Sequence, residues 1–246
     1  SNAGGFMAKT VEELVKAARK AEINGAERFG IVTSGNSLDS EELNTICETV
    51  REISTTGKIK PCASLGALSQ ESLEALRDSG LTRYHHNIET SENYYPSIVS
   101  THTFDQRVRT VRAAKNAGLE VCSGGIIGMG ETWGDRMEMA ILLRELDVDS
   151  VPLNFLVPVK GTPLAGADGV TTEEALRTIA MFRSVLPGVP IKIVADRESL
   201  FSGNELSMYM AGANGMMVGD YLTVAGRSID EDKDLIREVM GLWKGE

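Results

Sequence analysis

The chain has 246 residues, of which 42% are hydrophobic and 24% charged, a globular composition long enough to build one large core. Its formal net charge of −10 argues against nucleic acid or an anionic membrane as a partner, because both would repel an acidic surface. No apolar run reaches the roughly 18 residues that a membrane span needs. With no signal-peptide pattern either, we expect a cytoplasmic protein.

The beginning of the chain and its cysteines give two further expectations. Residues 1–3 (SNA) are typical of the remnant of a cleaved expression tag, so we expect a single domain over residues 4–246. The chain has three cysteines, Cys47, Cys62 and Cys122. Their number and wide spacing suit a reducing compartment and provide no local metal knuckle.

Helix-like and strand-like segments alternate along the chain, starting with a helix that Thr10 and Glu13 can cap. The predicted helices cover residues 11–24, 40–54, 70–78, 104–117, 132–146, 172–186, 205–211 and 231–242. The predicted strands cover residues 28–34, 60–66, 83–89, 120–128, 150–157, 191–195 and 215–219. Such alternation predicts a parallel sheet with right-handed crossovers. A (β/α)8 TIM barrel without its first strand would give this pattern.

Polar side chains gather at the end of the predicted strand 83–89. Because side chains alternate along a strand, His85, Asn87 and Glu89 would share one face. A buried polar group without a partner costs roughly 1–3 kcal/mol, so three together indicate a ligand site or a dense hydrogen-bond network.

Arg107 occupies the first turn of the predicted helix 104–117, where a cation opposes the helix dipole. A bidentate bond to a carboxylate would explain this placement, and a solvated surface arginine is the alternative.

Two predicted strands carry features typical of the carboxyl ends of barrel strands. Residues 119–131 (LEVCSGGIIGMGE) run from apolar residues into glycines, which let a ligand approach the backbone. Residues 150–164 (SVPLNFLVPVKGTPL) hold one polar residue, Asn154, inside an apolar run. Asn154 could bind a substrate or make an internal hydrogen bond.

These two segments, together with residues 83–89 (RYHHNIE), resemble the biotin synthase family of radical S-adenosylmethionine (SAM) enzymes. The resemblance covers about residues 11–234 and includes residues 219–223 (GDYLT). It implies an α/β fold, the radical SAM-type (β/α)8 TIM barrel. It also implies a sulfurtransferase that converts dethiobiotin to biotin by 5'-deoxyadenosyl-radical hydrogen abstraction, with sulfur inserted from an auxiliary iron–sulfur cluster.

The resemblance assigns binding roles but no catalytic side chain. It implies that SAM contacts Asn87, Glu89, Arg107, Ile126, Phe155 and Val157. It implies that dethiobiotin contacts Asn87 and Asn154. Glu89 stands where the family has aspartate, and His85 where it usually has asparagine.

The family's clusters match this chain only in part. The C-x3-C-x2-C motif for the catalytic 4Fe–4S cluster is absent from the sequence, so we expect this chain by itself to be inactive. Cys62 and Cys122 match two ligands of the family's auxiliary cluster, whereas Gly30 and Lys192 replace a third cysteine and an arginine. The type of auxiliary cluster therefore stays open, and residues 196–198 (DRE) could also reach a cluster or substrate.

The resemblance further implies dethiobiotin as a small-molecule substrate and a reductant such as flavodoxin or ferredoxin, and it leaves a homodimer open. One alternative is a related enzyme, hydrogenase-maturase-like or methylornithine-synthase-like, with another substrate. A second is a non-catalytic barrel fragment that only binds small molecules. A third is an aldolase-type barrel with Lys160 or Lys192 as a Schiff base.

Overall fold

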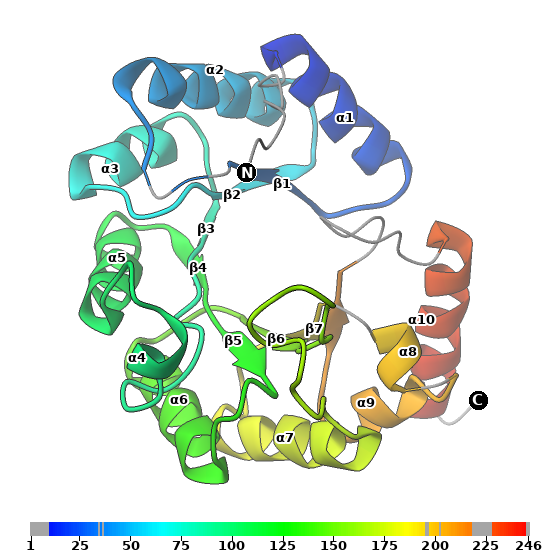
Figure 1. Ribbon diagram of the computed structural model, residues 1–246. Helices are drawn as coiled ribbons and strands as arrows, with labels where there is room; N and C mark the ends of the chain where they lie inside the picture. Colours follow the sequence, from blue (N-terminus) through cyan, green and yellow to red (C-terminus); the bar gives the residue numbers. More distant parts are fainter. Residues whose placement is uncertain are drawn as a thin grey trace. The chain divides into compact units, whose positions relative to one another are not determined.

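The structure, a computed structural model, describes residues 10–33, 35, 37–194, 197–201, 203–217 and 228–244. It divides into two compact units. Figure 1 colours the chain from its N-terminus to its C-terminus. Unit 1 comprises Ser1–His85 and Ala113–Glu120, and unit 2 comprises His86–Arg112 and Val121–Glu246. The single domain expected over residues 4–246 stays a prediction.

Unit 1 is built on parallel strands in the order β1-β2-β3. Its elements are α1 (Val11–Ile23), β1 (Arg28–Val32), α2 (Ser40–Thr56), β2 (Lys60–Ser64), α3 (Gln70–Asp78) and β3 (Arg83–His85). Capping boxes begin two of the helices, from Thr10 to Glu13 and from Asp39 to Glu42. Each satisfies backbone N–H groups that a helix start leaves without partners, which confirms both predicted starts.

Unit 2 holds a second parallel sheet in the order β5-β6-β7-β8. Its strands are β5 (Gly125–Ile127), β6 (Val151–Phe155), β7 (Ile191–Ile193) and β8 (Gly215–Met216). Its helices are α4 (Tyr95–Ile98), α6 (Trp133–Glu145), α7 (Thr172–Val185), α8 (Arg197–Leu200), α9 (Leu206–Met210) and α10 (Ile229–Lys244). Helix α5 (Phe104–Asn116) and strand β4 (Glu120–Cys122) have residues in both units.

The strand predicted over residues 120–128 was wrong in its continuity, because it is interrupted between β4 and β5. Gly124 lies in the gap, and a Cβ on it would overlap the carbonyl oxygen of Pro152. The Gly124 carbonyl accepts the backbone N–H groups of both Ile88 and Glu89. This close approach and shared acceptor replace the regular ladder of one long strand.

The strand predicted over residues 83–89 was too long. Strand β3 ends at His85, and Glu89 adopts a left-handed backbone with φ of 71°. The alternation that would place His85, Asn87 and Glu89 on one face therefore does not apply. Non-glycine residues with positive φ are uncommon and gather at functional sites.

The two faces of the unit 2 sheet differ in exposure. Alternate residues of β5, β6 and β7 are buried: Gly125, Ile127, Leu153, Phe155, Ile191 and Ile193. The residues between them include three that are half-buried, Ile126, Asn154 and Lys192. Helix α7 packs on α6 and on β7 (Figure 1). One sheet face thus belongs to the core, and the other presents side chains that a ligand can reach.

Candidate ligand-binding site

The segment after β3 joins Asn87 and Glu89 to the start of β5. The Asn87 side-chain oxygen accepts the Gly124 backbone N–H at 3.2 Å. The Glu89 carbonyl accepts the Ile126 N–H at 2.9 Å, and Glu89 forms a parallel bridge with Gly125. These bonds fix the backbone that carries the Asn87 amide and the Glu89 carboxylate.

Arg107 extends from α5 to this segment. Its Nη1 lies 3.3 Å from Glu89 Oε1 and donates to the Asn87 carbonyl at 3.0 Å. Its Nε donates to the Tyr95 hydroxyl at 2.9 Å. The Arg107 and Glu89 side chains are 24% and 20% exposed, so Arg107 is not the solvated surface arginine of the alternative reading. The structure therefore brings Asn87, Glu89 and Arg107 together, as the family resemblance implies.

Burial raises the pKa of the Glu89 carboxyl group, and this effect outweighs the opposing effects of Arg107 and of the Asn87 hydrogen bond. A carboxylate and a guanidinium that both reach solvent can bind a zwitterion, the former its ammonium or hydroxyl groups and the latter its carboxylate. The cluster thus suits the amino-acid portion and ribose of SAM.

The face of the unit 2 sheet that carries Ile126, Asn154 and Lys192 is the open sheet face. It adds two more of the predicted site residues. Ile126 and Asn154 are register partners on β5 and β6, so their side chains lie on the same face. The Asn154 side-chain amide donates to the Gly125 carbonyl at 3.3 Å. An apolar surface beside an amide suits an adenine ring and a polar substrate group.

Phe155 is buried and Val157 is exposed, whereas Ile126 and Asn154 are half-buried. The Phe155 side chain is 3% exposed and packs edge-on against Phe201 at 6.4 Å, so its ring belongs to the core. A ligand contact from Phe155 would have to come from its backbone. Val157 follows β6 and is 46% exposed. Both roles stay predictions.

Cys122 and Lys192 lie near each other within unit 2. Cys122 forms a parallel bridge with Ser150, whose hydroxyl accepts a 3.4 Å hydrogen bond from the Lys192 ammonium. In unit 1, Gly30 pairs with Cys62, and a Cβ at Gly30 would lie 3.9 Å from the Cys62 sulfur. Gly30 thus lies beside Cys62 but has no side-chain atom that could bind a cluster iron.

The described part of the chain has no group of three or more His, Cys, Asp or Glu residues that could hold a metal ion. Cys62 and Cys122 are buried, and the Cys62 thiol donates to the Phe29 carbonyl at 3.4 Å. Arg197, in the segment 196–198 expected to reach a cluster or substrate, has a side chain 1% exposed and pairs with Asp232 at 2.5 Å. Within the part of the chain that the structure describes, these residues do not make a complete cluster site.

The site residues predicted from the sequence do not include a network of ion pairs and hydrogen bonds around the loop after β5. The Glu131 carboxylate accepts the backbone N–H groups of Gly128 and Met129, each at 2.8 Å. Arg136 Nε donates to Glu131 Oε1 at 2.8 Å, and Arg136 Nη2 lies 2.7 Å from Glu174. This network holds the loop that follows Ile126.

Asp135 links this loop to the Glu89 segment. It accepts the Ser91 hydroxyl at 2.6 Å and closes a capping box with Thr132. These bonds, from Ser91 first and then from Thr132, lower the pKa of Asp135 to about 2. The spacing of Thr132 and Asp135 could have revealed the helix cap, but no sequence pattern indicates the bond from Ser91.

Asp135→Asn is expected to lower the free energy of unfolding by about 1–2 kcal/mol near neutral pH. A carboxyl group with a lowered folded pKa stabilises the protein above its unfolded pKa, and that stability is lost as pH falls toward the folded value. The difference from wild type should therefore shrink as pH falls from about 4 to about 2, measured by urea unfolding. Asp105→Asn, at a side chain 65% exposed, is the control. An Asp135→Asn deficit that is independent of pH would contradict this prediction.

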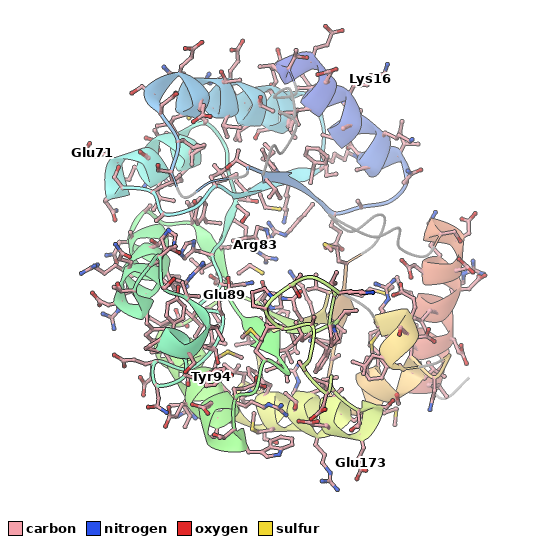
Figure 2. All side chains as sticks on the ribbon, in the orientation of Figure 1. Lys16, Glu71, Arg83, Glu89, Tyr94 and Glu173 are labelled. Carbon is pink, nitrogen blue, oxygen red and sulfur yellow. The ribbon has the colours of Figure 1, made fainter. Side chains whose placement is uncertain are left out.

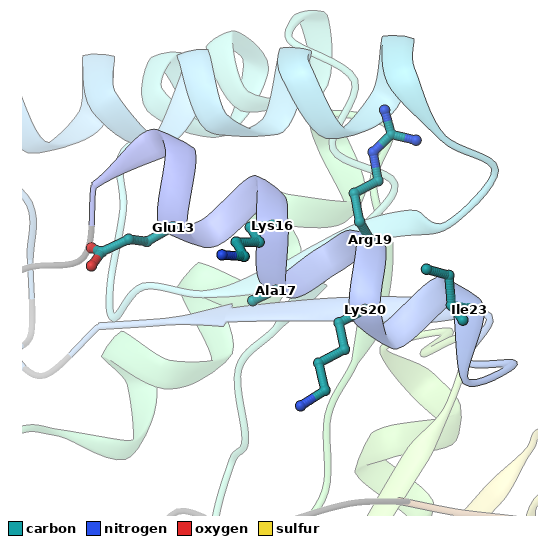
Figure 3. A pocket seen from close by; sticks show the side chains of 6 residues that line it. All are labelled: Glu13, Lys16, Ala17, Arg19, Lys20 and Ile23. Carbon is teal, nitrogen blue, oxygen red and sulfur yellow. The ribbon is translucent and has the colours of Figure 1, made fainter.

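A hollow of about 520 Å³ lies along the outer side of α1 (Figure 3). Its lining residues are Glu13, Lys16, Ala17, Arg19, Lys20 and Ile23. None of them is a predicted site residue, so this hollow is not a candidate for the site in unit 2.

The chain matches two family models and curated biotin synthases. Residues 2–143 match the family model of the Radical SAM superfamily, and residues 152–241 match the Biotin and Thiamin Synthesis associated domain. The biotin synthase of Thermotoga neapolitana is 50% identical over 234 residues, which cover 94% of this chain and 84% of that protein. The biotin synthase of Pelobacter propionicus is 48% identical over 229 residues, which cover 93% of this chain and 70% of that protein.

The crystal structure of methylornithine synthase has the same fold, with a TM-score of 0.73 at 22% identity over 97% of this chain and 73% of that one. The fold and sequence matches define an enzyme of the radical SAM superfamily. Within it, the chain belongs to the biotin synthase family. Membership confirms the predicted α/β radical SAM TIM-barrel fold and the expected SAM and iron–sulfur cofactors. Among the described helices, none is both long and apolar enough to span a bilayer.

Proposed function

We propose that this chain binds SAM and dethiobiotin in unit 2 and is a biotin synthase, a sulfurtransferase that forms biotin. The observation that carries the proposal is the Asn87–Glu89–Arg107 cluster joined to the first residues of β5. It occurs in a chain 48% and 50% identical to two biotin synthases. The cluster supplies opposite charges, and the open sheet face supplies an apolar surface and an amide.

Each side chain has a binding role in this proposal. The Arg107 guanidinium binds the SAM carboxylate, and Glu89 accepts hydrogen bonds from its amino or ribose groups. Ile126 packs against the adenine, and Asn154 orients dethiobiotin through its amide. When bound, SAM supplies the 5'-deoxyadenosyl group for hydrogen abstraction. The protein contributes orientation and exclusion of water, because the reacting atoms must be held close together.

The proposal extends to the surroundings of the enzyme. A small electron-transfer protein such as flavodoxin or ferredoxin serves as the reductant, and the cytoplasm is the compartment. Both follow from the chemistry of the family and from the sparse cysteines, which suit a reducing compartment. A homodimer stays a prediction.

The direct test is calorimetric titration of the 246-residue chain with dethiobiotin, with and without SAM. We expect dethiobiotin to bind and its affinity to rise with SAM, since adjacent ligands remove shared ordering costs. The absence of SAM binding would contradict the proposal. If SAM binds and dethiobiotin does not, a related radical SAM enzyme with another substrate becomes the better assignment. Gly30 and Lys192, which depart from the family pattern, favour that second candidate.

Asn154→Ala is expected to weaken dethiobiotin binding about 5- to 13-fold, the loss of one hydrogen bond of roughly 1–1.5 kcal/mol. The half-buried side chain makes one weak 3.3 Å bond within the protein, so the unfolding midpoint should change little. Asn214→Ala is the control, because the Asn214 side chain accepts the Ile191 backbone N–H at 2.8 Å. Equal dethiobiotin affinity in Asn154→Ala and wild type would remove Asn154 from the substrate site.

A further inference from the structure

We propose that two neighbouring tyrosines, Tyr94 and Tyr95, are positioning residues that each orient a different end of an adenosyl amino acid bound in unit 2. Tyr95 fixes the arginine that binds the amino-acid carboxylate. Tyr94 fixes the glycine loop that follows the adenine-binding strand. The inference rests on the proposed function, because it assumes that the site binds SAM.

Tyr95 acts on Arg107. Its hydroxyl accepts the Arg107 Nε–H at 2.9 Å, whereas Nη1 of the same guanidinium reaches Asn87 and Glu89. Tyr95 is itself 1% exposed, and its ring packs edge-on against Phe104 at 5.5 Å. An arginine side chain has about 2 kcal/mol of rotamer entropy to lose on binding. A hydroxyl held by core packing removes part of that loss before the ligand arrives.

Tyr94 acts on the loop after β5 at Met129, the residue that Glu131 also contacts. Its hydroxyl donates to the Met129 carbonyl at 2.7 Å, whereas Glu131 accepts the Met129 backbone N–H. A Cβ on Gly130 would lie 2.6 Å from the Tyr94 hydroxyl, so the phenol contacts the loop backbone directly. Burial, followed by the Glu131 and Asp135 carboxylates, raises the pKa of the Tyr94 phenol, which therefore stays a donor.

The two tyrosines share a short, well-fixed piece of backbone. Tyr94 is the N-cap residue of α4 and Tyr95 its first residue, followed by a proline with a fixed φ. The Tyr94 backbone N–H donates to the Ser91 hydroxyl, which donates to Asp135. Figure 2 labels Glu89 and Tyr94 on the segment that leads from β3 to α4. One backbone segment thus holds Glu89, the support for Arg107 and the support for the glycine loop.

Two ligands distinguish the two roles: S-adenosylhomocysteine, which has the amino-acid portion, and 5'-methylthioadenosine, which lacks it. We expect Tyr95→Phe to weaken S-adenosylhomocysteine binding about 5- to 20-fold and to leave 5'-methylthioadenosine binding unchanged. We expect Tyr94→Phe to weaken binding of both ligands by similar factors. Phe104→Leu, which loosens Tyr95 without altering its hydroxyl, should reproduce the selectivity of Tyr95→Phe and serves if that variant does not fold.

Tyr84→Phe is the matched control. Tyr84 is fully buried and its hydroxyl donates to the Gly66 carbonyl at 2.7 Å, within unit 1. It should lose stability but leave the affinity for both ligands unchanged. If wild type binds neither ligand, the proposed function fails and the inference with it. If wild type binds both, and Tyr95→Phe weakens both alike or behaves as Tyr84→Phe does, the inference alone is overturned.

Discussion

Arg136→Met is expected to lower the free energy of unfolding by about 3–5 kcal/mol, the largest stability loss that we predict for this chain. Arg136 and Glu131 have side chains only 4% and 1% exposed, with their charged atoms 2.8 Å apart. Removing the arginine leaves a buried carboxylate without its charge partner. Arg136 also lies 4.8 Å from the centre of the Trp133 ring and 2.7 Å from Glu174, and both contacts are lost with it.

Arg177→Met provides the control for this prediction. Arg177 pairs with Glu173 four residues earlier on α7, but the two side chains are 69% and 74% exposed. An exposed helical pair of this kind contributes about 0.3–0.5 kcal/mol. Urea unfolding of both variants should therefore separate them by several kilocalories per mole. Similar losses in the two would mean that the Glu131 carboxylate is adequately stabilised by the Gly128 and Met129 N–H groups alone.

The ends of elements were predictable wherever local chemistry determines them. Thr10, Asp39 and Thr132 begin helices because each side chain accepts the N–H of the third helical residue. Such a contact spans three residues, so it can be read directly from the sequence. The half-buried polar residues Asn154 and Lys192 also stand out inside apolar strands, and the structure places both on the open face.

The backbone irregularities were not predictable in the same way. The end of β3 and the gap between β4 and β5 arise because Gly124 approaches Pro152 and accepts hydrogen bonds from Ile88 and Glu89. These partners are distant in the sequence, and strand propensity contains no information about them. The positive φ of Glu89 follows from the same tertiary contacts.

The candidate site was predictable as a set of residues rather than as a geometry. The family resemblance grouped Asn87, Glu89 and Arg107, and the structure shows how they meet. The family resemblance did not point to Tyr94 or Tyr95, because aromatic residues near a helix start usually belong to the core. Only the positions of their hydroxyls, 2.7 Å from the Met129 carbonyl and 2.9 Å from Arg107 Nε, connect them to the site.

Glu89→Gln is expected to separate function from stability at this site. Because burial raises the pKa of Glu89, its ionised form opposes folding. A carboxyl group with a raised folded pKa stabilises the protein below its unfolded pKa, and that stability is lost as pH rises through the folded value. The neutral glutamine avoids this loss, so the variant should unfold at an equal or higher urea concentration near neutral pH, with the difference disappearing below about pH 4.

The same variant should bind S-adenosylhomocysteine about 10- to 100-fold more weakly, since a hydrogen bond to a charged group contributes about 1.5–3 kcal/mol. Glu89→Asp retains the charge and introduces the residue usual in the family, so it should keep most of the affinity. A gain in stability combined with a loss of affinity is the pattern of a residue retained for binding. If Glu89→Gln is instead less stable than wild type and binds S-adenosylhomocysteine normally, the Glu89–Arg107 pair is a structural ion pair, and the SAM site must lie elsewhere.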